Sequence, residues 1–179
     1  MYVTVFGGSK LEPDDSGYRD AMRLGRLLGE AGHVVLTGGY IGSMEAVSRG
    51  AAEVGAHVIG ITCDEIEKWR PVRPNQWLTE ERRCPTLTQR IQALIESCDA
   101  AFALPGGAGT LTEISMMWTL LLTGIIAPRP LILLGEGWHS VFSLFFEKFN
   151  DYVPQDQRSW LTFLPNVDEG IQYLTSLKL

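Results

Sequence analysis

Short apolar runs that end in glycine alternate with longer segments of helical period along most of the chain. The short runs predict strands at residues 2–6, 33–37, 57–62, 100–104 and 130–134. The longer segments predict helices at residues 15–32, 43–54, 86–97, 110–122, 138–149 and 167–177. Strands and helices that alternate in this way are typical of βαβ units around a parallel sheet. We therefore expect an α/β fold, a Rossmann-like, doubly wound parallel sheet in a single domain over residues 1–179.

Residues 63–85 break this alternation, because they carry three prolines, four arginines and five acidic residues with no sustained period. They are expected to form a long loop with room for one short helix, and loops of this length are usually lids or binding loops. Two interpretations of the aromatic and basic side chains stay open: they contact a ligand, or they pack the loop as a lid. These side chains are Trp69, Arg70, Arg73, Trp77 and Arg83.

Composition and charge narrow the choice of partners. The chain has 179 residues, is 45% hydrophobic and carries a formal net charge of −6, which is ordinary for a globular protein and argues against binding to nucleic acid or to an acidic membrane. Its three cysteines lack the spacing of a disulfide framework or a zinc site. No basic leader or apolar run of about 20 residues is seen, so a cytoplasmic location is expected.

Two predicted strands end in glycine loops that open helices. The first loop, in LTGGYIGSMEA, contains Gly38, Gly39 and Gly42; the second is residues 105–109, in ALPGGAGTLTE. Glycines let backbone amides converge on an anion, and the positive end of a helix dipole favours phosphate there. Neither loop has the dinucleotide or P-loop spacing, and a plain tight turn is the structural alternative for each. Together they suggest a nucleotide-sized ligand.

Glu113 and Arg90 are the candidate catalytic residues. Glu113 lies in the first turn of the helix after the second loop, so that its carboxylate can point back at a ligand. The alternative is a capping box in which Thr110 caps the helix and Glu113 reaches back to its amide. Arg90 is on the preceding helix, where taken by itself it is an ordinary surface arginine.

The string PGGAGTLTE, residues 105–113, resembles the PGGxGTxxE signature of the LONELY GUY (LOG) family of cytokinin-activating phosphoribohydrolases. The resemblance extends over about residues 3–134 and includes GGSK, TGGYIGSMEAVSRGA and HVIGIT. It implies hydrolysis of a nucleoside 5'-monophosphate, AMP or an N6-modified AMP, to free base and ribose 5-phosphate. The family's catalytic arginine and glutamate map onto Arg90 and Glu113. The implied phosphate-binding residues are Ser9, Gly38, Gly39, Gly42, Gly106, Gly107, Gly109 and Thr110.

Some positions depart from the family pattern. The MHxRK segment reads LTQRI here, with Thr88 at the histidine and Ile91 at the lysine, and Tyr40 stands at a glycine of GGGxxGLMG. The MEAVSRGA string also resembles the molybdenum-cofactor carrier proteins, a neighbouring branch that binds a pterin phosphate without turnover. A non-catalytic carrier of a nucleotide or molybdopterin is therefore the alternative function, and a regulatory nucleotide sensor is a weaker one.

The remaining expectations concern cofactors and assembly. Proteins of the LOG family are often labelled as lysine decarboxylases. That activity would require pyridoxal phosphate on a Schiff-base lysine, and none of the four lysines lies in a recognisable cofactor segment. The three histidines are scattered, so neither a metal nor an organic cofactor is expected. Residues 116–121 are apolar almost all round their predicted helix, which indicates core or subunit contact and favours a homodimer or a higher homo-oligomer.

Overall fold

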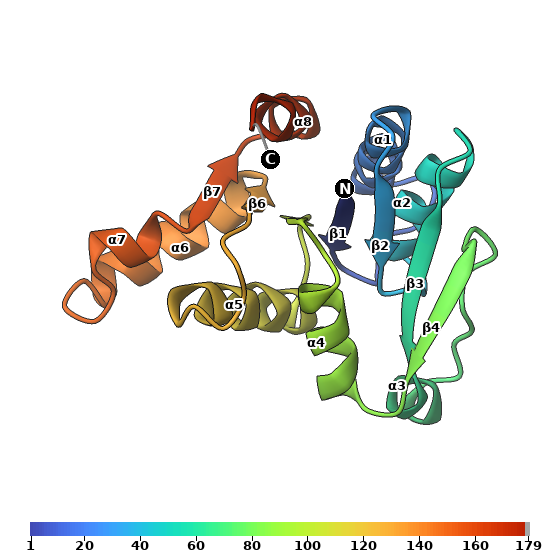
Figure 1. The fold of residues 1–179 in the computed structure, drawn as a ribbon, viewed down its shortest axis with the longest axis horizontal. Helices are drawn as coiled ribbons and strands as arrows, with labels where there is room; N and C mark the ends of the chain where they lie inside the picture. The colour runs from blue at the N-terminus through green and yellow to red at the C-terminus, as the bar shows by residue number, and fades with distance from the viewer. Residues whose placement is uncertain (178–179) are drawn as a thin grey trace.

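One seven-stranded sheet organises the chain in the computed structural model, which describes residues 1–177 (Figure 1). All its strand pairs are parallel, and the strand order is β4-β3-β2-β1-β5-β6-β7. The strands are β1 (Tyr2–Phe6), β2 (Val34–Thr37), β3 (Val58–Cys63), β4 (Glu80–Cys84), β5 (Ala100–Ala103), β6 (Leu131–Leu134) and β7 (Leu161–Leu164). The order reverses between β1 and β5, as it does in a doubly wound fold, so the predicted fold class is confirmed.

Helices cover both faces of the sheet. One face carries α1 (Ser16–Glu30), α2 (Ser43–Ala52) and α8 (Val167–Ser176), and the other carries α4 (Leu87–Glu96), α5 (Ala108–Leu122) and α6 (Glu136–Lys148). Two short helices, α3 (Asp64–Trp69) and α7 (Gln155–Arg158), lie in connections. In Figure 1, α1 and α8 lie on the opposite side of the strands from α4 and α5.

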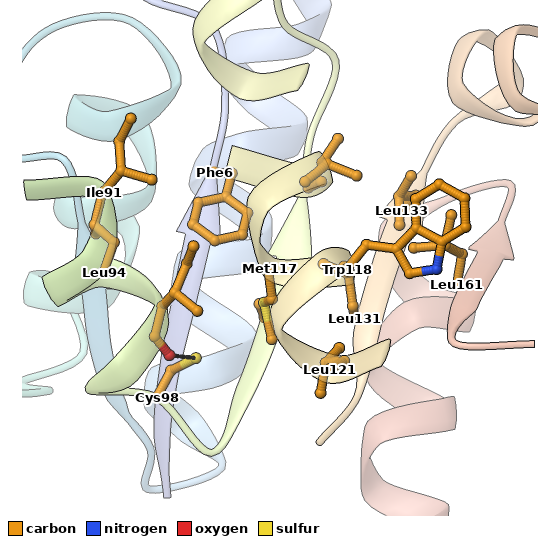
Figure 2. Packing of buried hydrophobic residues seen from close by; sticks show 14 of the residues in the cluster. Phe6, Ile91, Leu94, Cys98, Met117, Trp118, Leu121, Leu131, Leu133 and Leu161 are labelled. Carbon is orange, nitrogen blue, oxygen red and sulfur yellow. Dashed lines mark hydrogen bonds between the residues drawn. The ribbon is translucent and has the colours of Figure 1, made fainter. Parts of the chain in front are cut away.

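The core is divided by the sheet into two apolar layers. The central strands are buried on both sides, which explains why they appear in the sequence as continuous apolar runs rather than as alternating ones. Beneath α4 and α5, Phe6 of β1 packs with Leu94, Met117 and Leu131. Figure 2 shows Trp118 beside Leu133 of β6 and Leu161 of the end strand β7. The indole of Trp118 donates its N–H to the carbonyl of Gln157, 2.9 Å away, and so ties α5 to α7.

The expectation of a long loop over residues 63–85 is wrong in part. The segment contains α3 and the edge strand β4, which pairs with β3 from Ile59↔Glu80 to Cys63↔Cys84. The sequence of β4, EERRC, is almost wholly charged, because an edge strand of this kind exposes its side chains to water. Strand β7 and helix α7 were also not predicted, because β7 (LTFL) is only partly buried and α7 (QDQR) is a single turn of polar residues.

The other predicted elements are present, and their bounds differ from the prediction by at most two residues. The difference that matters most for the candidate site is at α5, which begins at Ala108 rather than at Thr110. The glycine loop before it is therefore shorter than residues 105–109. Within residues 1–177, no helix combines the length and the apolar character needed to cross a membrane.

Candidate functional site

The loops that follow β1, β2 and β5 meet at the carboxyl edge of the sheet. At this edge the chain leaves the neighbouring strands β1 and β5 toward opposite faces of the sheet. Gly8, after β1, donates its amide to the carbonyl of Pro105, after β5, at 3.3 Å. The carbonyl of Gly8 accepts from the amide of Ser43, the first residue of α2, at 2.9 Å. At Gly42, with φ +71°, a Cβ would stand 2.6 Å from the Gly8 carbonyl, so the close approach of these loops requires glycine there.

A cleft of about 600 Å³ opens at this edge on the side of α4 and α5. In doubly wound sheets the switch point is where ligands bind, and the volume lies within the range of small-molecule sites. The cleft brings together both candidate catalytic residues and the whole second glycine loop, residues 105–109. Its lining includes Ser9, Lys10, Tyr40, Met44, Arg90, Gly106, Gly107, Gly109, Thr110 and Glu113.

The second glycine loop faces this cleft with open amides. Helix α5 begins at Ala108 after Gly107, and its first intrahelical bond runs from the Leu111 amide to the Gly107 carbonyl at 3.0 Å. The amides of Ala108, Gly109 and Thr110 therefore precede that bond and are free for a ligand. A Cβ at Gly107 or Gly109 would meet nothing within 4 Å, so the loop is not covered by other segments at these two positions.

The expected cap by Thr110 is wrong, because Gly107 is the N-cap and no side chain caps α5. Thr110 is instead buried in the first turn, with its hydroxyl beneath the loop: a Cβ at Gly106 would stand 2.1 Å from the Thr110 Oγ1. The capping-box alternative for Glu113 falls with it, since within residues 1–177 the Glu113 carboxylate makes no hydrogen bond. Its carboxylate is therefore available to a ligand.

The first glycine loop has a different position. Gly38, Gly39 and Gly42 are buried and do not line the cleft, so the loop packs against neighbouring segments. A Cβ at Gly38 would collide with the Arg90 guanidinium, and one at Gly39 with Thr62 of β3. These glycines pack behind the residues that line the cleft. Direct contact of their amides with phosphate stays a prediction.

Arg90 is a buried residue of the site, with 6% of its surface exposed, rather than a surface arginine. Its Nε donates to the carbonyl of Ile61, at 2.7 Å, and its Nη2 to the carbonyl of Gly38, at 3.1 Å. The guanidinium also lies over the ring of Tyr40, 5.7 Å from the centroid. Contacts to the ends of β3 and β2 thus hold the cation in one orientation, with Nη1 left toward Glu113.

Glu113 is 8% exposed, and its Oε1 lies 3.8 Å from Nη1 of Arg90. Burial raises the pKa of the Glu113 carboxyl to about 7, although the nearby Arg90 cation acts in the opposite direction. A carboxyl that titrates near neutral pH in a cleft is suited to electrostatic stabilisation or to general acid–base work. The two helices α4 and α5 thus bring together a buried charge pair from residues 23 positions apart in sequence, at 90 and 113.

Sequence reasoning missed several lining residues. Tyr40, noted only as a departure from the family pattern, is fully buried and its hydroxyl accepts from the Cys63 amide at 2.7 Å. Ile66 and Leu87 add apolar surface to the cleft, and Met44 contacts Arg90. No motif signals Ile66 and Leu87, because only the packing of α3 against the start of α4 brings them to the cleft. Of the open candidates in residues 63–85, Trp69 and Arg70 line the cleft.

Arg83 and Trp77, of the same segment, have structural partners, and Arg73 does not line the cleft. Arg83 forms ion pairs with Asp64 and Glu67 of α3, each at 2.6 Å, and Trp77 packs against Arg49, with the guanidinium 5.4 Å from its ring centroid. Over the described residues 1–177, no group of three or more histidine, cysteine or acidic side chains is placed to hold a metal ion.

Comparison with known proteins places this architecture in a family. Residues 44–174 match the family model described as "Possible lysine decarboxylase". The chain is 34% identical over 179 residues to the cytokinin riboside 5'-monophosphate phosphoribohydrolase LOG3 of Arabidopsis thaliana. The aligned region covers 96% of this chain and 80% of that protein.

Solved structures share the fold. The protein TM1055 is 27% identical and superposes with a TM-score of 0.76, over 98% of this chain and 99% of that one. A molybdenum cofactor binding protein from Rippkaea orientalis, 23% identical, also gives a TM-score of 0.76, over 98% of this chain and 95% of that one. The family model and the Arabidopsis relative together show that this chain belongs to the LONELY GUY (LOG) family.

Proposed function

We propose that this protein is a phosphoribohydrolase that cleaves the N-glycosidic bond of a nucleoside 5'-monophosphate, with AMP or an N6-modified AMP as substrate. The observation that carries the proposal is the buried Arg90–Glu113 pair in the same cleft as the open amides of α5. The similarity to a named cytokinin riboside 5'-monophosphate phosphoribohydrolase supports the same reaction class.

The 5'-phosphate binds at the start of α5 in this proposal. The amides of Gly107, Ala108, Gly109 and Thr110 face it, and the helix dipole adds partial positive charge. Ser9 and Lys10, after β1, line the same cleft and supply a hydroxyl and a cation. The net charge of the chain is negative, but this local field is positive and receives a single small anion.

The chemistry follows from placing the ribose beside Glu113. As the bond between C1' and the base nitrogen breaks, positive charge develops on the ribose, and an ionised Glu113 stabilises it. A water oxygen then bonds to C1', one of its protons passes through the Glu113 carboxylate, and the base leaves with a proton on its nitrogen. Arg90 holds the carboxylate in position and keeps its pKa from rising further. No metal or organic cofactor takes part in this scheme.

The test is release of free base from purified protein. Incubation with a panel of nucleoside monophosphates, followed by chromatography, should show free base and ribose 5-phosphate in equal amounts. Glu113→Gln should reduce kcat by about 100- to 1,000-fold, the usual effect of removing one group that stabilises transition-state charge. Release that is unchanged in the folded Glu113→Gln variant, or absent from wild-type protein with every nucleotide, would contradict the proposal.

A second candidate is a carrier that binds a phosphorylated pterin without turnover. One position favours it: the family's lysine after the catalytic arginine is Ile91 here, and this side chain is buried in the core beneath α4. Tight binding of a phosphorylated pterin, together with no base release from any nucleotide, would establish the carrier instead.

We also propose that the chain forms a homodimer in the cytoplasm through the outer face of α5. That face carries a groove with an apolar floor, and helices with such a face usually have a partner. The groove is lined by Leu111, Thr112, Ser115, Met116, Thr119 and Leu120. The inner face of the same helix, with Met117 and Leu121, belongs to the core, which accounts for its apolar sequence all round.

A further inference from the structure

Trp69 is an unusual residue of the cleft because its side chain remains open to water. It is the last residue of α3, lines the cleft, and is 79% exposed. Tryptophan is highly buried on average, since its indole carries a large apolar surface. The other four tryptophans of the chain are buried or half-buried. An exposed indole at the rim of a cleft is a surface that a flat ligand group can cover.

The cleft is polar at one end and apolar at the other. The open amides of α5 follow β5, whereas α3 follows β3, and these strands are separated in the sheet by β2 and β1. Three strand spacings amount to roughly 14 Å. Arg90 bridges part of this distance, because it bonds to the ends of β2 and β3 and approaches Glu113 of α5. Ile66 and Leu87 join Trp69 at the apolar end.

Helix α3 is fixed in place despite its short length. Arg83 of β4 bonds to Asp64 and Glu67, and Glu67 also accepts from the Tyr40 hydroxyl at 3.2 Å. Glu65 accepts from the Leu87 amide at the start of α4, at 2.8 Å. Because these bonds orient α3 before any ligand arrives, little ordering is needed for Trp69 to make a contact.

Arg70 supplies a polar group beside the indole. Its guanidinium lies 5.7 Å from the centroid of the Trp69 ring. Its Nε is buried and lacks a hydrogen-bond partner within residues 1–177. A buried donor without an acceptor is costly, so a ligand atom that accepts from it would contribute to binding.

We propose that Trp69 is the specificity-determining platform on which the base of the nucleotide stacks, with Arg70 donating to an acceptor atom of the base. This inference rests on the proposed function, because it assumes that the phosphate is at α5 and the ribose at Glu113. A nucleotide then spans the cleft from open amides to open indole. Trp77, from the same segment, has no such role because it packs on Arg49 outside the cleft.

The experiment is an equilibrium titration of AMP and of ribose 5-phosphate, which lacks the base, onto Glu113→Gln protein, in which the expected loss of kcat slows the consumption of AMP during the measurement. Adding Trp69→Ala should weaken AMP binding by about 10-fold, the size of one lost base–aromatic stack, and leave ribose 5-phosphate binding unchanged. Trp69→Phe should restore most of the AMP affinity. Trp77→Ala, a matched tryptophan-to-alanine change, should alter neither.

The outcomes separate this inference from the proposed function. Loss of affinity for AMP alone supports the platform, even if the wild-type protein then releases no base. Equal affinity of the Trp69→Ala variant for AMP, with base release intact in otherwise wild-type protein, overturns the platform and leaves the hydrolase standing. Parallel loss of both ligands, or loss that Trp69→Phe does not reverse, also overturns it. If neither AMP nor an N6-modified AMP binds before Trp69 is changed, both proposals are overturned.

Discussion

The guanidinium of Arg90 occupies the space that a side chain at Gly38 would need. A Cβ on Gly38 would stand 1.8 Å from Nη2 of Arg90 and 2.5 Å from the sulfur of Met44. The Gly38 carbonyl accepts from the same Nη2, so glycine at this position both admits and orients the arginine. The first glycine loop therefore contributes to the site through Arg90, whatever its own amides bind.

Gly38→Ala should consequently leave the protein folded but lower kcat/KM for base release. The methyl group displaces the far end of a flexible side chain rather than backbone, so the fold can adapt, but Arg90 loses its alignment with Glu113. A misplacement of about 1 Å in a catalytic site can cost about 100-fold in rate, and we expect a fall of that order in kcat/KM for base release. Gly137→Ala, in α6, is the control, since a Cβ there meets nothing within 4 Å. Equal activity of the two variants would disprove the alignment role.

The pH dependence of base release should report the Glu113 carboxyl. Because its pKa is about 7 and the proposed chemistry needs the ionised form, kcat/KM should rise with pH and level off above neutrality. Arg90 opposes the upward shift, so Arg90→Gln should move this limb to higher pH, whereas Arg90→Lys, which keeps the positive charge, should move it less. A limb that stays in place in Arg90→Gln would assign the titration to another group.

The same carboxyl should make stability depend on pH. In the folded protein the pKa of Glu113 is raised above its ordinary value of 4.5, so the folded state retains a proton that the unfolded chain loses. The contribution of Glu113 to the free energy of unfolding is complete below about pH 4.5. It declines as the pH rises toward 7, by up to about 3 kcal/mol. Glu113→Gln removes this decline. Urea unfolding of the wild-type and Glu113→Gln proteins at pH 5 and pH 8 measures this decline. If the free energies of unfolding of the two proteins differ by the same amount at both pH values, the pH dependence does not come from Glu113.

Tyr40→Phe should destabilise the segment that carries Trp69. The hydroxyl of Tyr40 accepts from the Cys63 amide and donates to Glu67, and its loss leaves a buried amide without an acceptor. We expect a cost of about 1–3 kcal/mol in the free energy of unfolding. Tyr152→Phe, which changes a tyrosine exposed to solvent, is the matched control and should alter stability by less than about 0.5 kcal/mol.

The outer face of α5 gives a prediction about assembly. Leu111→Asp places a charge in the groove of that helix, so light scattering after size exclusion should show the mass of a monomer in place of a dimer. Ile125→Asp, at an exposed position after α5 that is outside the groove, should remain dimeric. A monomeric wild-type protein, or a dimer that persists in Leu111→Asp, would refute this interface.

The sequence alone was sufficient for the central elements and for the pair of catalytic candidates. Strands such as β3 and β5 are buried on both faces, so their apolar runs stand out, and glycine marks the turns that follow. The sequence also predicted Glu113 in the first turn of this helix. Because α5 begins at Ala108, two residues before the predicted start, Glu113 lies in the second turn, about one turn from the open amides. Arg90 became a candidate through its resemblance to a family motif, since an arginine on a helix carries no signal of burial.

Only the tertiary structure decided the elements and contacts that depend on partners distant in sequence. Strand β4 forms because β3 offers it an edge, and its charged residues show no strand period of their own. Arg90 is buried because the ends of β2 and β3 accept its hydrogen bonds, and its charge opposes the rise in the Glu113 pKa that burial of that carboxyl causes. Trp69 reaches the cleft because ion pairs from β4 hold α3 over it. Local periodicity indicates which apolar residues are buried. The partners of charged and hydrogen-bonding side chains come from segments distant in sequence, so they are determined only when the sheet assembles.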